Sequence, residues 1–430
     1  MQKNLWALAG LLLTLVASQA SAEEPEKAIY ESAGSGGINA ADQRNKPYLI
    51  LISIDGFRWD YFDLYETPAM DEIIANGLRA EAMIPVFPTL TFPNHYSIAT
   101  GLYPANHGLI GNRFPGKDRS RFYTLYDRKS VQDGRWYGGE PVWVTAEKNG
   151  LVTAAYYFVG TEAAVGGVPL TYWHDFDATV PGHDRVAKVL EWLAMEEARR
   201  PHLITLYFED VDEASHRFGP GSAESIESIR RVDDYIAQLM NGVAALAIAE
   251  RVYVVIVSDH GQSLVKKDAP PFIITSVASL DDLTVVDHGA ASFIYFPEPD
   301  PQRATKIRDS INASWRNGKA MLRAETPGSW HVTEAAGFAD IIVQADPGHT
   351  VYASSENAGK GSPGDHGWAP DFQEMHGIFI ARGPRLPNGV RIPPINAVDV
   401  YPLLLEILEL PKNTAIDGDQ ELLPSLLRPN

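Results

Sequence analysis

Four apolar runs, each ending in a polar turn, constrain the fold of this 430-residue chain most strongly. The runs span residues 48–54, 203–208, 252–257 and 377–381. Unbroken apolar runs of this length are typical of central strands that helices cover on both faces. Between the runs, apolar residues recur at helical spacing in segments 186–193 and 226–239. The sequence therefore predicts an α/β fold with a mostly parallel central sheet, helices on both faces, and loop or lid insertions.

The turns after these runs carry side chains suited to chemistry. Asp55 follows the first run and Asp259-His260 follow the third, and in a parallel α/β sheet functional groups collect at the carboxyl ends of the strands. Asp212 and His216 lie four residues apart, so they share one face of a helical turn. Seven oxygen and imidazole side chains could thus hold two zinc ions around a nucleophile: Asp55, Thr91, Asp212, His216, Asp259, His260 and His366. This set indicates a metallohydrolase.

Thr91 is the candidate nucleophile in this set. It lies between Pro88 and Pro93, just before a segment that could begin a helix. A threonine at a helix N-terminus is commonly a cap. If it binds zinc instead, its hydroxyl can lose its proton and attack phosphorus. The residues alone leave both roles open.

Six motifs occur in order between residues 48 and 384. They are Asp55-Gly56; Thr91-Phe92-Pro93-Asn94-His95; Gly101-Leu102-Tyr103-Pro104 with His107-Gly108 and Asn112; Asp212 with His216; Ser258-Asp259-His260-Gly261; and Asp365-His366-Gly367. Together they resemble the nucleotide pyrophosphatase/phosphodiesterase family of the alkaline phosphatase superfamily. The chain looks like a bacterial exported member with an alkaline-phosphatase-like fold.

The resemblance implies a residue-by-residue assignment of the site. One zinc would be held by Asp55, Thr91, Asp259 and His260, and the other by Asp212, His216 and His366. Thr91 would be the nucleophile and form a phospho-threonine intermediate. Asn112 and the Thr91 backbone amide would stabilise the non-bridging phosphate oxygens. Phe92, Tyr172 and Tyr207 would flank a nucleobase, although aromatic residues often serve only core packing.

Two departures from the family bear on specificity. Leu90 precedes Thr91 where many animal relatives have lysine, and this favours diesters over monoesters. Residues 158–162 read Phe-Val-Gly-Thr-Glu where many animal relatives have Trp-Pro-Gly-Ser. The base pocket is therefore less strongly predicted than the metal site.

The N-terminal segment predicts an exported protein, and the composition bears on its compartment. Residues 1–22 resemble a cleaved signal peptide, with an uncleaved anchor as the alternative, and residues 23–430 would form one catalytic domain. Within it, residues 113–175 would be a lid or pocket wall and residues 261–364 an insertion. The chain has no cysteine and hence no disulfide, which fits a Gram-negative periplasm. A net charge of −19 argues against stable binding to nucleic acid.

The sequence leaves other functions open. The same site could serve a phospholipid-head-group diesterase, or a phosphonate or phosphomonoester hydrolase. A non-enzymatic exported zinc-binding protein is a third alternative. A sulfatase is disfavoured because the chain has no cysteine to form formylglycine and no Ser-x-Pro-x-Arg motif. The partner expected from the sequence is a small nucleotide or another phosphodiester, with no membrane span after signal cleavage.

Overall fold

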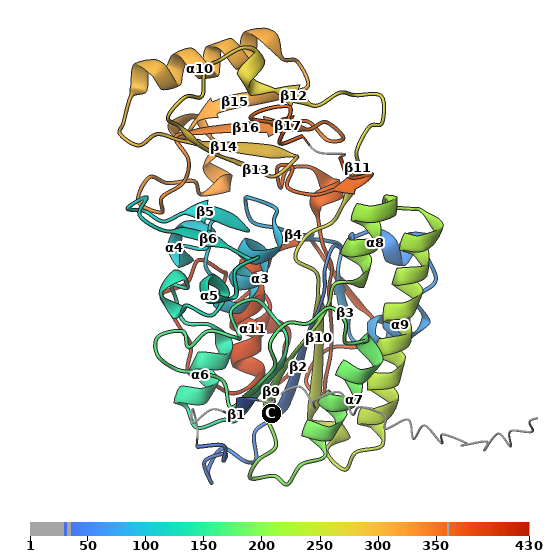
Figure 1. Cartoon of the computed structure of the whole chain (residues 1–430). Helices are drawn as coiled ribbons and strands as arrows, with labels where there is room; N and C mark the ends of the chain where they lie inside the picture. Colours follow the sequence, from blue (N-terminus) through green and yellow to red (C-terminus); the bar gives the residue numbers. More distant parts are fainter. Residues whose placement is uncertain (1–29, 32–35, 359–360, 430) are drawn as a thin grey trace, which may run out of the picture.

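The computed structural model describes residues 30–31, 36–358 and 361–429 (Figure 1). The predicted signal peptide, residues 1–22, lies outside the described residues. No helix in the described ranges combines the length and apolar character needed to cross a membrane.

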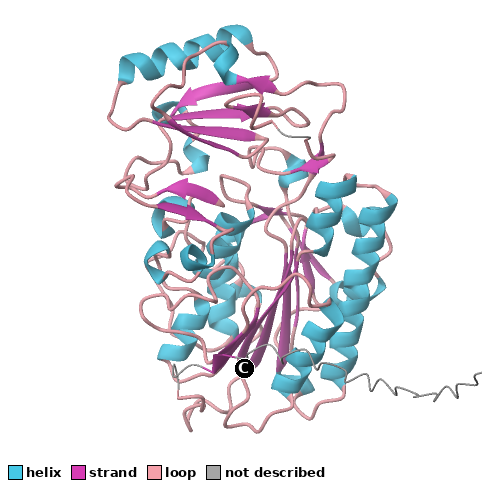
Figure 2. Ribbon diagram, in the orientation of Figure 1, coloured by secondary structure: helices cyan, strands magenta, loops and turns pink. Residues whose placement is uncertain are grey.

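A nine-stranded sheet forms the centre of the molecule, in the order β1-β8-β7-β9-β2-β10-β19-β3-β20 (Figures 1 and 2). Its parallel block consists of β8 (Tyr172–Trp173), β7 (Thr153–Tyr156), β9 (Leu203–Phe208), β2 (Tyr48–Ile54) and β10 (Val252–Val257). The remaining strands are β1 (Tyr30–Glu31), β19 (Phe379–Arg382), β3 (Leu78–Ala80) and β20 (Val390–Ile392). The predicted mostly parallel α/β sheet is confirmed.

The fourth apolar run differs from the other three in direction. It forms β19, which pairs antiparallel with β10. Its carboxyl end at Arg382 therefore lies at the edge of the sheet opposite to the ends of β2, β9 and β10. The turn that follows it is removed from the site, whereas the turns after the three parallel strands meet.

Alternate residues of β2 pack against two helical layers on opposite faces. Ile50 and Ile52 belong to a buried cluster with α2 (Pro68–Ala75), α7 (Gly182–Leu193) and α9 (Ala223–Ala244). Leu49 and Leu51 belong to another, with α3 (Thr91–Thr100), α6 (Val142–Lys148) and α11 (Val400–Ile407). Figure 1 shows these two groups of helices on either side of the sheet. Because both faces are covered, every residue of β2 is buried.

Residues 261–364 contain a second sheet with its own apolar cluster (Figure 2). Its antiparallel strands are β13 (Thr284–Asp287), β14 (Ala291–Tyr295), β16 (Ile341–Ala345) and β15 (Gly318–Leu322), and α10 (Pro301–Ser314) packs on it. The two ends of the segment pair with each other, β11 (Ser263–Leu264) antiparallel to β18 (Gly364–Asp365). This pairing returns the chain to His366.

Residues 113–175 contribute to several parts of the fold. They contain the hairpin of β5 (Arg113–Pro115) and β6 (Phe122–Thr124), the short helix α5 (Arg128–Val131), and also α6, β7 and β8. The segment thus supplies two strands of the central sheet in addition to loops. The division into one catalytic domain with a lid and an insertion stays a prediction.

Candidate two-metal active site

Two groups of side chains lie at the carboxyl ends of the parallel strands. Asp55 follows β2, and Asp259 and His260 follow β10. The potential ligand atoms of these three residues lie within 4.8 Å of one another. The residues are buried, so any charge they carry is poorly screened by water.

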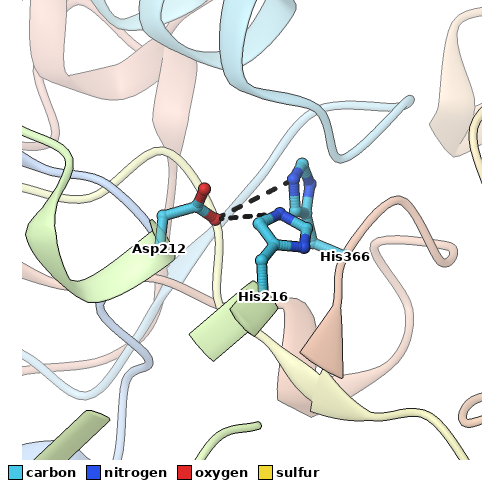
Figure 3. Close-up of side chains that lie close together, drawn as sticks. All are labelled: Asp212, His216 and His366. Carbon is cyan, nitrogen blue, oxygen red and sulfur yellow. Dashed lines mark ion pairs between the residues drawn. The ribbon is translucent and has the colours of Figure 1, made fainter. Parts of the chain in front are cut away.

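The second group consists of Asp212, His216 and His366 (Figure 3). Asp212 and His216 lie on α8 (Asp210–Phe218), which follows β9, and His366 follows β18. Asp212 Oδ1 lies 3.4 Å from His216 Nε2 and 3.9 Å from His366 Nε2. The ring of His366 stacks on that of His260 with centroids 3.7 Å apart, so the two groups adjoin.

Backbone carbonyls orient all three imidazoles in the same way. The Nδ1 atoms of His216, His260 and His366 lie 3.0, 3.0 and 2.8 Å from carbonyl oxygens of Gly364, Gly261 and Thr89. Carbonyl oxygens only accept, so each Nδ1 carries the proton and each Nε2 has a free lone pair. Each Nε2 also faces the carboxylates of its group. This is the tautomer that metal-ligating histidines adopt.

The carboxylates of the first group repel one another. Burial raises the pKa of Asp55 well above its usual range, and the charges of Asp259 and Asp212 raise it further. Burial also disfavours the charged form of Asp259, but the positive charge that His260 and His95 carry when doubly protonated outweighs it and holds the pKa of Asp259 well below its usual range. In the described part of the chain, Asp55 Oδ1 and Asp259 Oδ2 are buried without a hydrogen bond. Acceptor oxygens left in this state fit a cation.

Thr91 lies beside the first group. It is the first residue of α3, and its Oγ1 is 3.4 Å from His260 Nε2. The neighbouring amide, Phe92 N–H, donates to Asn112 Oδ1 at 2.9 Å, which turns the Asn112 amide toward the start of the helix. His95, one turn further on, lies with Nδ1 2.9 Å from the Thr91 carbonyl and Nε2 2.8 Å from Ser53 Oγ. Buried His95 therefore ties the first turn of α3, which carries Thr91, to β2.

An aromatic pocket of about 210 Å³ opens beside Thr91. At one end it is lined by Asp55, Thr91 and Asp212. Its other lining residues are Phe92, Leu125, Arg128, Val131, Tyr157, Phe158, Val159, Gly160, Glu162, Phe176 and Tyr207. A larger cavity, about 550 Å³, lies between α7, α8 and α9, but Thr91 is not among its lining residues. The smaller pocket is the candidate substrate site because Thr91, the candidate nucleophile, lines it.

The structure corrects the prediction for Tyr172. Its side chain is only 1% exposed, and its ring stacks on that of Trp192 in the core with centroids 6.4 Å apart. Tyr172 is not among the residues that line the pocket. Phe176, which the sequence did not single out, is 41% exposed and lines the pocket with its ring 6.0 Å from that of Tyr207. Phe92 and Tyr207 do line the pocket. The aromatic side chain supplied by this segment is therefore four residues further on than predicted.

A charged cluster that the sequence did not indicate includes two lining residues of the pocket, Arg128 and Glu162. Arg128 binds Glu162 through both terminal nitrogens, with one contact of 2.9 Å, and also binds Asp175. Glu162 accepts the backbone N–H of Phe176 at 3.2 Å. The only signal in the sequence was the departure at residues 158–162. The cluster joins the start of α5 to the two loop segments that carry Glu162 and Asp175.

Comparison with known proteins identifies the family. A family model described as type I phosphodiesterase / nucleotide pyrophosphatase matches residues 49–377. The chain belongs to this family. Rat ectonucleotide pyrophosphatase/phosphodiesterase family member 3 is 29% identical over 85% of this chain. The alignment covers 42% of the rat protein, so this chain spans less than half the length of that relative.

Solved structures of the family share the fold. Murine ectonucleotide pyrophosphatase/phosphodiesterase 5 superposes with a TM-score of 0.82 at 27% identity, covering 89% of this chain and all of the murine chain. An inactive threonine-to-alanine variant of that murine protein has been solved in complex with AMP, also with a TM-score of 0.82. The family assignment agrees with the resemblance of the six motifs.

Proposed function

We propose that this chain is an exported two-zinc phosphodiesterase or nucleotide pyrophosphatase that hydrolyses nucleotide diesters or pyrophosphates to nucleoside 5′-monophosphates. One observation carries the proposal: Thr91 Oγ1 lies 3.4 Å from His260 Nε2 of the first metal group. Thr91 also lines the aromatic pocket, together with Asp55 and Asp212. A phosphorus atom held there would meet the hydroxyl at the junction of the two groups. The attached nucleoside would extend into the pocket.

The donor atoms suit two zinc ions. Asp55, Thr91, Asp259 and His260 would hold one ion, and Asp212, His216 and His366 the other. When bound, two ions supply positive charge to the attacking and leaving oxygens of an in-line displacement. Oxygen and imidazole ligands also accept manganese or cobalt. The orientation of the imidazoles and the unbonded carboxylate oxygens support this assignment.

Thr91 is the proposed nucleophile. Its hydroxyl loses a proton and its oxygen forms a bond to phosphorus, while the bond to the leaving oxygen breaks and that oxygen takes up a proton. Water then attacks the phospho-threonine, releases the monophosphate and returns a proton to the threonine oxygen. Asn112 accepts the Phe92 N–H through Oδ1, so its NH₂ group can donate to a non-bridging phosphate oxygen. The inactive variant of the murine relative likewise has a threonine replaced by alanine.

The pocket favours a diester with an aromatic substituent. Phe92, Phe176 and Tyr207 offer ring faces for a nucleobase, and such stacking contributes about 1–3 kcal/mol per base. A monoester carries an additional negative charge. Arg128, the one cation among the described lining residues, is already bound to Glu162 and Asp175. The extra charge of a monoester would gain little here.

We also propose that the protein is exported, with residues 1–22 as its signal peptide, to a periplasm. The signal-like N-terminus supports export, and the absence of cysteine fits a Gram-negative periplasm better than an animal cell surface.

The decisive experiment compares three chromogenic esters with zinc present and absent. The substrates are the p-nitrophenyl ester of thymidine 5′-monophosphate, bis-p-nitrophenyl phosphate and p-nitrophenyl phosphate, each with wild type and Thr91→Ala. We expect zinc-dependent preference for the nucleotide ester, abolished in the variant. Preference for the monoester, or indifference to the nucleoside, would move the function to a phosphomonoester, phosphonate or lipid-head-group substrate. A zinc-loaded protein inert to all three would point to a binding role.

A further inference from the structure

Gln262 connects the two metal groups. It lies two residues after His260 in the chain. Its side chain contacts Asp212 on α8. The Nε2 group donates to Asp212 Oδ1 and lies 3.4 Å from the Asp212 carbonyl oxygen. Gln262 is 0% exposed, so neither contact competes with bulk water.

The oxygen that Gln262 binds is the one that faces the histidines. Asp212 Oδ1 lies 3.4 Å from His216 Nε2 and 3.9 Å from His366 Nε2 (Figure 3). The terminal torsion of an aspartate is soft, and either oxygen could face the site. Because a carboxylate oxygen can accept from more than one direction, the amide can restrain Oδ1 without blocking it.

Packing alone does not explain a glutamine at this position. Within the described ranges, Gln262 Oε1 is buried and has no hydrogen-bond partner. A buried acceptor in this state costs about 1–3 kcal/mol, which an apolar side chain of similar size would avoid. If the Gln262 amide were turned over, its Oε1 would face Asp212 Oδ1, and two acceptor oxygens would repel each other. The donor end of the amide is therefore the part that the site uses.

Gly56 provides the space for this contact. Its φ is +68°, and a Cβ at this position would lie 2.9 Å from Gln262 Nε2 and 3.1 Å from the Asp212 Cα and Cβ atoms. The Gly56 N–H also donates to Asp259 Oδ1 at 3.2 Å. The glutamine amide, Gly56 and the two aspartates thus form one contact that spans both groups.

We propose that Gln262 is a positioning residue. It fixes the metal-facing oxygen of Asp212 and so holds the Asp212 group in position relative to the Asp259–His260 segment. The inference rests on the proposed two-metal function. It concerns the ligand geometry of the second group, so its direct consequence is the affinity for one of two zinc ions. Outer contacts of this kind typically change metal affinity 10–100-fold when they are removed.

The test is a zinc titration of Gln262→Met, which keeps the side-chain length and removes the donor. We expect two zinc ions per wild-type chain, and in the variant a loss of about 10–100-fold in affinity for one ion only, measured by competition with a chromophoric chelator. The thermal unfolding temperature of the variant in EDTA should equal or exceed that of the wild type, because the substitution also removes the buried Oε1 that has no hydrogen-bond partner. Gln262→Leu repeats the test if the methionine variant does not fold.

Gln238→Met is the control, because this amide lies on α9 and donates to the His183 carbonyl, away from the metal groups. It should titrate as wild type. Equal affinity of wild type and folded Gln262→Met for both ions would overturn the role of Gln262 while leaving the two-zinc function intact. A wild type that binds fewer than two zinc ions would overturn both. A loss of apoprotein stability with unchanged affinities would show that Gln262 only packs.

Discussion

The hydroxyl of Tyr207 donates a hydrogen bond of 2.6 Å to Asp55 Oδ2, so a ring that borders the pocket also restrains a predicted metal ligand. Burial raises the pKa of Tyr207 well above its usual range, and the charge of Asp55 adds to this shift, so the phenol keeps its proton as a donor. The sequence indicated Tyr207 only as a neighbour of the base. Its contact with Asp55 gives it a part in both the pocket and the metal site.

We expect Tyr207→Phe to weaken zinc binding at the first group by about 10–100-fold, because Asp55 loses its donor while the ring remains. The KM for the thymidine ester at saturating zinc should change little. Chelator competition and steady-state kinetics measure the two quantities separately. If KM rises and zinc affinity does not change, the hydroxyl of Tyr207 acts on substrate binding and not on the metal ligand Asp55.

Phe176→Ala should raise the KM of the nucleotide ester by about tenfold or more, since the loss of a stacking ring costs about 1–3 kcal/mol. The KM of bis-p-nitrophenyl phosphate should change less, because it carries no nucleobase. Tyr172→Leu is the comparison, since it removes the ring of a residue that lies in the core and keeps apolar bulk there. The corrected pocket would be wrong if Tyr172→Leu, and not Phe176→Ala, separated the two substrates.

Gly56→Ala should lower activity more than tenfold and lower the zinc affinity of the group that contains Asp212. The reason is that the new Cβ would lie 3.1 Å from the Asp212 Cα and Cβ atoms. Gly166→Ala is a close control, with φ of +60° and, in the described structure, nothing within 4 Å of the added Cβ. Both variants should lose about 1–2 kcal/mol of stability from backbone strain. Kinetics and urea unfolding distinguish the two effects, and equal activities would show that the site tolerates the contact.

His107 should make stability fall in acid. Burial lowers the pKa of His107 to about 3, whereas an unfolded histidine titrates near 6.5. Between these values only the unfolded state binds the proton, so the contribution is complete above about pH 6.5 and is lost as the pH falls toward 3. From pH 7 to pH 5 the loss attributable to His107 is about 2 kcal/mol.

The measurement is urea unfolding of EDTA-treated protein at the two pH values. His107→Gln should reduce the difference between them by about that amount, and His183→Gln, which changes an exposed histidine, should not. The pH dependence will not vanish, because burial also lowers the pKa values of His202 and His288 to about 4. An unchanged difference in His107→Gln would refute the assignment.

The sequence predicted the strands and the side chains of the metal groups because both depend on local patterns. Apolar runs identify buried strands, and the motifs after β2 and β10 place Asp55, Asp259 and His260 at one edge of the sheet. The groups that orient the histidines could not be predicted in this way. They are backbone carbonyls of Thr89, Gly261 and Gly364, and a carbonyl is present at every residue.

The base pocket was harder to predict for a geometric reason. Tyr172 and Phe176 are four residues apart, and which of them faces the pocket depends on where β8 ends. β8 keeps Tyr172 in the sheet, packed near Trp192, and the chain leaves the sheet before Phe176. The direction of β19 was similarly open, because an apolar run does not state whether its neighbour is parallel.

The short pairing of β11 with β18 fixes where the chain returns to the site. Ser263 pairs with Asp365 and Leu264 with Gly364, so the long excursion between them leaves and returns through one closed seam beside His366. The place where the chain re-enters the site beside His366 is therefore set by this pairing, and it does not follow from the number of residues between His260 and His366.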